Sequence, residues 1–135
     1  MILFENSIIK LDYTPATDIL DVKYPDLHLY ILPEIKHSID ILVDTVKNYD
    51  VKKVLIDSTD TVMSVTAEES REIATHMAFS LASTRLQKLA RLQSLDNTVE
   101  TRAKSTIQYF NKSQMLPFEL QNFSDRTVAL AWLQS

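Results

Sequence analysis

Five small polar residues in a row, Asp57-Ser58-Thr59-Asp60-Thr61, form the first group in this chain whose types and spacing could do chemistry. They follow the stretch 51–57, which has the apolar pattern of a buried strand, and ligands of open α/β sheets usually bind at the carboxyl ends of such strands. Side chains of these types could bind a cation, accept a phosphate or orient a polar ligand. Because the same residue types are also common turn formers after a strand, the run predicts a candidate binding edge and no particular reaction.

The histidines are the next candidates, because histidine is the commonest acid–base residue and metal ligand. There are three of them, His28, His37 and His76, and no two have the i, i+4 spacing of a helical zinc site. His37 and His76 fall inside predicted helices, whereas His28 falls between a predicted strand and a predicted helix. The sequence therefore predicts no catalytic residue and no metal site. An enzyme that uses Asp57 or His28 is the third-ranked function.

A nearly continuous apolar run over residues 27–32 is needed neither by the strand pattern before it nor by the helix pattern after it. It could form the core end of the connection between them. Alternatively it could cover a ligand pocket or a contact with a partner, because exposed apolar patches usually mark such contacts. We accordingly name Leu27, His28, Leu29 and Tyr30 as a candidate surface for an apolar ligand or a partner.

The composition excludes several kinds of site. The 135 residues include no glycine and no cysteine. Without glycine the chain cannot form a Walker loop, a dinucleotide fingerprint or a nucleophile elbow. Without cysteine it has no disulfide, no thiolate nucleophile and no iron–sulfur or zinc-ribbon ligand set. We therefore expect no cofactor.

The charge and length limit the partners and the number of domains. Fourteen Lys and Arg face 18 Asp and Glu, which gives a net charge of −4. Nucleic acid is a poor partner for such a chain, because affinity for it comes mainly from cations that neutralise phosphates. No stretch approaches the roughly 20 apolar residues of a membrane span, and we expect a cytoplasmic protein. The length favours one domain over residues 1–135.

The apolar pattern predicts which elements hold these candidates in place. Residues 9–13 and 20–24 alternate as two strands of a hairpin, and a helix with one apolar stripe follows Pro33. The strand 51–57 is apolar on both faces, as expected when helices cover both sides. A capping box, Thr66-Ala67-Glu68-Glu69, opens a second helix that runs to about residue 86.

The rest of the chain continues the same alternation. A strand is predicted over 88–93, a third helix capped by Asn97 and Glu100, a strand at 118–120, and a final helix capped by Ser124 or Asp125. The order β-β-α-β-α-β-α-β-α predicts an α/β domain. We expect a mixed five-stranded sheet, with an N-terminal antiparallel hairpin and then parallel βα units, flanked by four helices.

This order of elements resembles the STAS-like domain of bacterial anti-sigma-factor antagonists, in particular an uncharacterised cytoplasmic branch that is similar to lipid-binding CRAL-TRIO domains. The resemblance covers nearly the whole chain. It rests on the opening hairpin, on the strand 53–57 and on the C-terminal segment 123–133, in which an aromatic residue and a turn precede a helix that ends in Trp-Leu.

The resemblance implies a phosphorylation switch. In the family, an Asp-Ser-Ser/Thr-Gly motif opens the helix after the third strand, and phosphorylation of its serine by a partner kinase changes partner binding. The matching stretch here, 63–67, has hydroxyls at Ser64 and Thr66 but neither the aspartate nor the glycine. The letters Asp57-Ser58-Thr59-Asp60 are similar to the motif, yet they lie earlier, at the end of the strand.

The combined reading predicts a non-catalytic regulatory or protein-interaction module of STAS-like fold. Its partner would be an unidentified protein, and a homodimer is a second expectation. The start of the second long helix would favour an acidic group or a phosphate. The alternative function is a carrier of a small apolar or lipid-like ligand. The predicted binding residues are Asp57, Ser58, Thr59, Asp60, Ser64 and Thr66.

Overall fold

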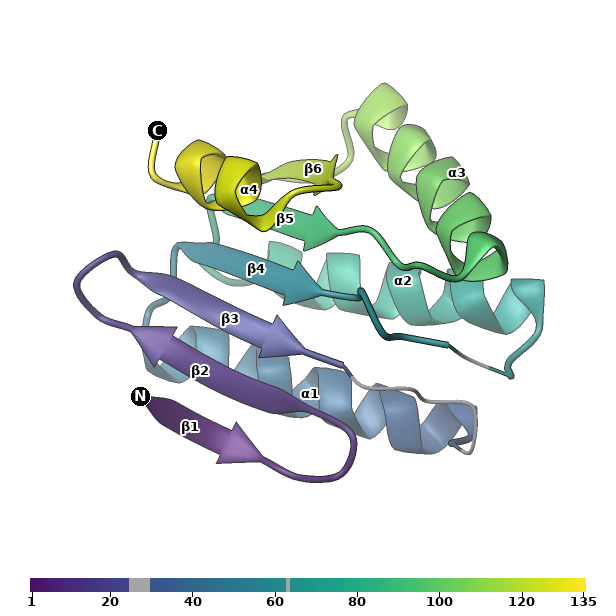
Figure 1. The fold of residues 1–135 in the computed structure, drawn as a ribbon, viewed down its shortest axis with the longest axis horizontal. Helices are drawn as coiled ribbons and strands as arrows, with labels where there is room; N and C mark the ends of the chain where they lie inside the picture. The colour runs from purple at the N-terminus through teal and green to yellow at the C-terminus, as the bar shows by residue number, and fades with distance from the viewer. Residues whose placement is uncertain (25–29, 63) are drawn as a thin grey trace.

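The computed structural model describes residues 1–24, 30–62 and 64–135, and these form an α/β fold around a six-stranded mixed sheet (Figure 1). The strands lie across the sheet in chain order. The first three pair antiparallel, and the third to the sixth pair parallel. The strands are β1 (Ile2–Glu5), β2 (Lys10–Thr14), β3 (Ile19–Lys23), β4 (Lys53–Asp57), β5 (Lys88–Leu92) and β6 (Glu119–Phe123).

The predicted count of five strands was wrong, because β1 adds a sixth strand at the edge of the sheet. It has only four residues, and its register with β2 shifts between Ile2 and Phe4. An irregular register breaks the two-residue alternation by which strands are recognised. Edge position also leaves Ile2 half exposed, so the segment lacks a clear buried face. The chain therefore opens with three antiparallel strands in place of one hairpin.

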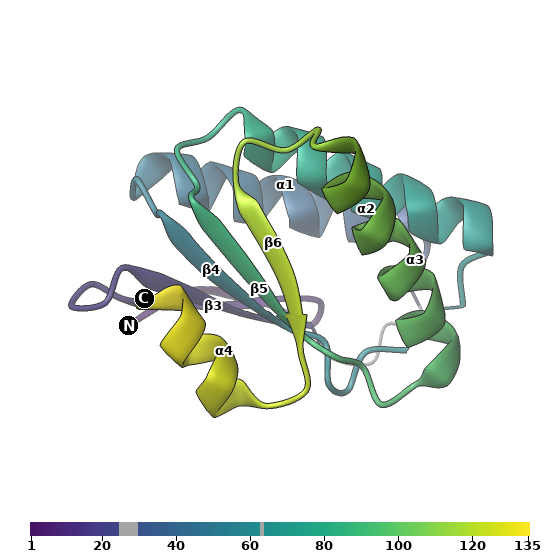
Figure 2. The ribbon, with the colours of Figure 1, turned by 90° about the horizontal axis from the view of Figure 1, so that it is seen from above.

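Four helices of the described residues flank the sheet, as predicted, but they are distributed unequally. Figure 2 shows the first three on one face of the sheet and the last on the other. The second helix ends four residues before the predicted position, where the Thr84 hydroxyl donates to the Leu81 carbonyl at 2.6 Å. Leu86 instead begins the approach to β5 and is buried. The helices are α1 (Leu32–Asn48), α2 (Ala67–Ala82), α3 (Asn97–Ser113) and α4 (Arg126–Leu133).

The helix caps confirm some predictions and correct others. The capping box of α2 is present, since the Glu69 amide donates to Thr66 Oγ1 at 3.1 Å and the Thr66 amide donates to Glu69 Oε1 at 3.0 Å. For α3 the predicted caps were wrong: the Asp96 carboxylate accepts from the Val99 amide at 3.0 Å. Glu100 has a different role, described below. In α4 the cap is Asp125, one of the two predicted residues.

The core lies on both faces of β4, which confirms the prediction that helices cover this strand on two sides. Val54 and Ile56 belong to the larger core, beneath α1 and α2. Leu55 faces the other way and packs with Ala129 and Leu133 of α4. Among the helices of the described residues, α4 alone therefore buries the second face of the sheet.

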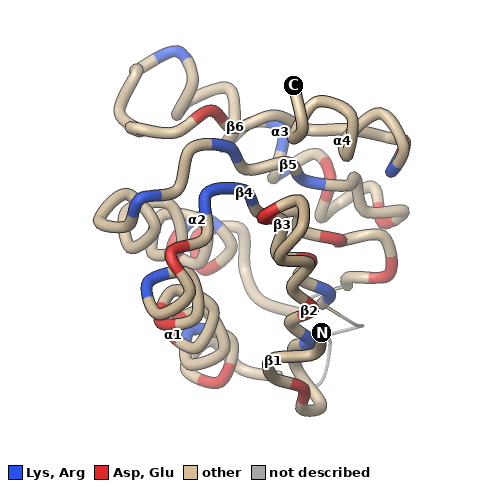
Figure 3. Tube along the Cα trace, turned by 90° about the vertical axis from the view of Figure 1, so that its left-hand side faces the viewer, with Lys and Arg blue, Asp and Glu red and all other residues tan. Residues whose placement is uncertain are grey.

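Positively charged Lys and Arg residues and negatively charged Asp and Glu residues are intermixed along α1 and α2 (Figure 3). Polar side-chain contacts also join these helices: Lys36 Nζ lies 2.6 Å from Glu72 Oε1, and His76 Nε2 lies 2.8 Å from Asp40 Oδ1. Such exposed pairs contribute little stability each, and the apolar residues that the two helices share in the larger core hold them together. Within the described ranges, no helix is both long and apolar enough to cross a membrane.

Candidate ligand-binding pocket

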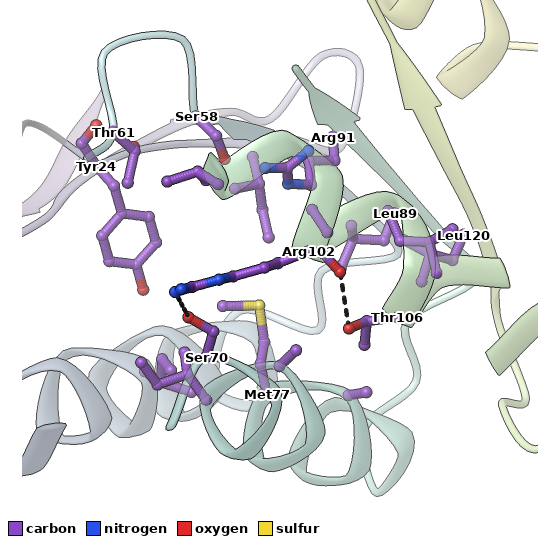
Figure 4. Close-up of a pocket in the computed structure, with 18 of the residues that line it drawn as sticks. Tyr24, Ser58, Thr61, Ser70, Met77, Leu89, Arg91, Arg102, Thr106 and Leu120 are labelled. Carbon is purple, nitrogen blue, oxygen red and sulfur yellow. Dashed lines mark hydrogen bonds between the residues drawn. The ribbon is translucent and has the colours of Figure 1, made fainter. Parts of the chain in front are cut away.

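A pocket of about 170 Å³ lies between the helices α1, α2 and α3 and the sheet face formed by β4, β5 and β6 (Figure 4). Its walls are mainly apolar. The sheet contributes Ile56, Leu89 and Leu120, and the helices contribute residues such as Met77 and Phe110. The pocket therefore lies within the layer between sheet and helices, where a continuous apolar core would otherwise be expected.

Small side chains on the facing helices create this space. Ala74 and Ala78 lie four residues apart on α2, and Ala103 lies on the opposing face of α3. Residues at this spacing share one helix face. Because alanine fills much less volume than leucine, the two helices meet the sheet without closing the gap between them.

Tyr24, which follows β3, contributes a polar group with an unusual status. Its side chain lines the pocket and is only 6% exposed, yet its hydroxyl has no hydrogen-bond partner among residues 1–24, 30–62 and 64–135. A buried hydroxyl without a partner costs on the order of 1–3 kcal/mol, and such groups are rare. Burial raises the pKa of Tyr24 to about 12, and the nearby Ser38 hydroxyl has the opposite, smaller effect. Ser38 donates to the Ile35 carbonyl at 2.7 Å and does not form a hydrogen bond with the phenol. The phenol therefore stays protonated and can donate.

Arg102, on α3, extends across the pocket toward Ser70 of α2 (Figure 4). Its Nη1 donates to the Val65 carbonyl at 3.0 Å and to Ser70 Oγ at 3.2 Å. Both bonds use the same nitrogen, and a guanidinium has five N–H donors. In the part of the chain that the structure describes, no carboxylate lies within ion-pair distance of Arg102. Its positive charge is therefore uncompensated beside the pocket.

Arg91 also lines the pocket, but its charge is compensated. Arg91 Nη1 donates to Glu100 Oε1 at 2.9 Å and to Asn122 Oδ1 at 3.1 Å. The Ser94 amide and the Asn122 side chain each donate to Glu100 at 2.7 Å. The guanidinium of Arg102 is therefore the pocket's unbalanced charge.

The pKa of Glu100 follows from this network and predicts a pH dependence of stability. Burial would raise this pKa, but the hydrogen bond from Asn122, the charge of Arg91 and the Ser94 amide outweigh burial and lower it from 4.5. A carboxylate with a lowered folded pKa contributes stability above its unfolded pKa, and this contribution is lost as the pH falls through the folded pKa. At pH values lower than about 4.5, we expect the free energy of unfolding, measured in urea, to decrease.

Variants at two glutamates test this pH dependence. Glu100→Gln should flatten the acid decline, because an amide does not titrate. Glu68→Gln, at an exposed residue of α2, should leave the wild-type decline unchanged. An acid decline of equal steepness in wild type and Glu100→Gln would contradict the assignment.

The predicted binding edge after β4 is largely occupied by its own contacts. Asp57 Oδ1 accepts from the Thr59 amide at 3.0 Å and from the Thr59 hydroxyl at 2.6 Å. The Thr66 hydroxyl caps α2, whereas Asp60 and Ser64 are exposed. Of the predicted binding residues, the structure brings Ser58 to the pocket and leaves the others outside its lining. That this edge contacts a protein partner stays a prediction.

The other predicted residues are also placed separately. Leu27, His28 and Leu29 lie outside the described residues, and Tyr30 is partly buried against the larger core. His37 is exposed on α1, away from the pocket lining. In the described ranges, no three histidine, aspartate or glutamate side chains gather so as to hold a metal ion.

Sequence reasoning missed Tyr24 and Arg102, although one signal was available. In the sequence, Val99 and Ala103 recur at the four-residue spacing of one helix face, and Arg102 lies on the same face. A charged residue on an apolar helix face is unusual enough to mark a site. Tyr24, by contrast, reads as an ordinary core aromatic at the end of a strand.

Comparison of the chain with known protein families, with curated proteins and with solved structures finds no match. The STAS-like resemblance therefore stays a hypothesis about the fold family.

Proposed function

We propose that this protein is a non-catalytic binding module whose pocket between α2, α3 and the sheet holds one small, mainly apolar ligand. The observation that supports this function is the apolar pocket of about 170 Å³ itself. Protein interiors are close-packed, and voids larger than a water molecule are few in each domain. A space of this size beneath two helices is therefore best explained by an occupant.

The volume limits the size of the occupant. An apolar cavity of roughly 150 Å³ holds a benzene molecule. The space here, about 170 Å³, suits one aromatic ring or a short branched alkyl group with a small substituent. We therefore favour a small body over a long lipid chain. Because most of the helical wall comes from α2 and α3, a bound ligand would also tighten the packing of these two helices against each other.

Filling the pocket should weaken the binding of an apolar ligand. We expect Ala103→Leu to weaken the binding of toluene, an uncharged probe, by at least about tenfold, because the added carbons occupy the space of the ring. The affinity is measured by titration of the isotope-labelled protein with toluene, following backbone amide NMR shifts. Ala74→Leu, on the opposite helix, should act in the same way and guards against a folding defect in the first variant.

Ser105→Leu is the matched control, because it adds the same side chain to an exposed position of α3 outside the pocket lining. This variant should bind toluene as the wild type does. The proposed function is wrong if the wild-type protein gives no saturable shifts, or if the two pocket variants bind toluene with unchanged affinity.

A further inference from the structure

The pocket contains two polar groups that its own walls do not satisfy. The Tyr24 hydroxyl is buried without a hydrogen-bond partner in the described part of the chain, and the Arg102 guanidinium has no carboxylate beside it there. Figure 4 shows the Tyr24 hydroxyl directed toward the guanidinium end of Arg102. An otherwise apolar pocket thus has a donor pair at one end.

From this arrangement we infer that the ligand is a small monocarboxylate with an apolar body, whose carboxylate pairs with Arg102 and accepts a hydrogen bond from Tyr24. The inference rests on the proposed function, since it names the chemical class of the ligand for that same pocket. The ligand would be an aromatic acid with one ring or a short-chain aliphatic acid, because the pocket volume admits either.

The charge of Arg102 favours an anion. A partly buried charge is costly unless it is paired. The guanidinium is a planar fork whose geometry matches a carboxylate, and bonds between two charged partners are about twice as strong as neutral ones. Its two contacts, to the Val65 carbonyl and Ser70 Oγ, both come from Nη1 and carry no compensating negative charge. The remaining N–H donors are available to a ligand.

Tyr24 favours an acceptor at the same end. A carboxylate has two oxygens and about four lone-pair sites, so one group can accept from Arg102 and from a second donor. A phenol that stays protonated at neutral pH can supply that second bond. An amine ligand could accept from neither group when it is protonated.

The balance of charge favours one negative charge over two. Arg91, the other arginine in the lining, is already paired with Glu100. A monocarboxylate would therefore neutralise the pocket, whereas a phosphate dianion would bury a surplus negative charge among apolar walls. Wall chemistry and charge point to the same class of molecule.

Three probes with one ring and different charges test the inference: benzoate, benzamide and benzylammonium. We expect benzoate to bind at least about tenfold more tightly than benzamide, and benzylammonium to bind more weakly than either. Affinities are measured by titration calorimetry and by amide NMR shifts at pH 7. Two further probes are compared with benzoate. Phenyl phosphate tests a dianion against a monoanion, and hexanoate tests an aliphatic body against an aromatic one.

Variants identify the groups that recognise the charge. Arg102→Met should bring the benzoate and benzamide affinities to within about threefold of each other, and Arg102→Lys should keep part of the preference as a point charge. Tyr24→Phe should lower benzoate affinity several-fold without lowering the melting temperature of the free protein, because it removes an unsatisfied hydroxyl. Arg71→Met, at an exposed position on α2, is the control for loss of one positive charge and should keep the full preference.

Each outcome separates the two proposals. Equal affinity for benzoate and benzamide, a preference that survives Arg102→Met, or tighter binding of phenyl phosphate would overturn the carboxylate assignment and leave the apolar pocket in place. Failure of every probe, toluene included, would overturn both. If Arg102→Met does not fold, Arg102→Lys and Tyr24→Phe decide the assignment by the same affinity ratio.

Discussion

Replacement of Glu100 by alanine is expected to lower the free energy of unfolding by about 3–5 kcal/mol, because it leaves a buried arginine without its anion. The Arg91 and Glu100 side chains are 13% and 9% exposed. Glu100 accepts from Arg91, from the Ser94 amide and from Asn122, so the truncation also removes the partner of a buried amide. The network joins β5, β6 and the start of α3. Its loss should be seen as a lower midpoint in urea denaturation.

Two further variants show whether the cost comes from the buried pair. Glu68→Ala removes an exposed carboxylate from the first turn of α2, and it should cost less than about 1 kcal/mol through the helix dipole alone. The double variant Arg91→Met, Glu100→Leu should recover part of the loss, because replacing both charges leaves no unpaired ion. A Glu100→Ala protein as stable as Glu68→Ala would show that solvent already screens the pair.

Leu55→Ala is expected to cost about 3 kcal/mol, in the range measured for buried leucines. Leu55 is fully buried and lies at the centre of the smaller core, which also contains Ala129 and Leu133 of α4. Since α4 is the only helix of the described fold on this face, few neighbours can move to fill the cavity. Thermal and urea unfolding measure the loss.

Leu95→Ala is the matched control, because Leu95 is 80% exposed. It should change the free energy of unfolding by less than about 0.5 kcal/mol. A loss below about 1 kcal/mol for Leu55→Ala would mean that the face under α4 contributes little to stability.

Local sequence patterns predicted those helices and strands whose formation depends mainly on residues close together in the chain. The apolar run 54–56 identified the central strand, and the capping box at Thr66 identified the start of α2, since both depend on residues close in sequence. β1 was missed because it is short, irregular in register and half exposed. The Asn97 cap was wrong because the adjacent Asp96 takes that position. A one-residue shift of this kind is decided by backbone geometry.

The candidate site was predicted much less well. The run 57–61 has chemically suggestive residues, yet Asp57 and Thr59 mostly satisfy each other in a local turn. The pocket instead depends on small residues of α2 facing α3 across the sheet. Such a space is a property of how distant elements pack. The helical spacing that puts Arg102 on the face of Val99 and Ala103 marks a charge at an apolar surface, but it does not place Tyr24 or the pocket itself.

The order of the sheet has a consequence for how the chain is made. Every strand from β1 to β6 is hydrogen-bonded to the strand that follows it in sequence. During synthesis the sheet can therefore grow at one edge as each segment leaves the ribosome, and no late segment has to insert between two strands that are already paired. Pairing neighbours in turn means that each parallel pairing closes over a single crossover helix and never over two.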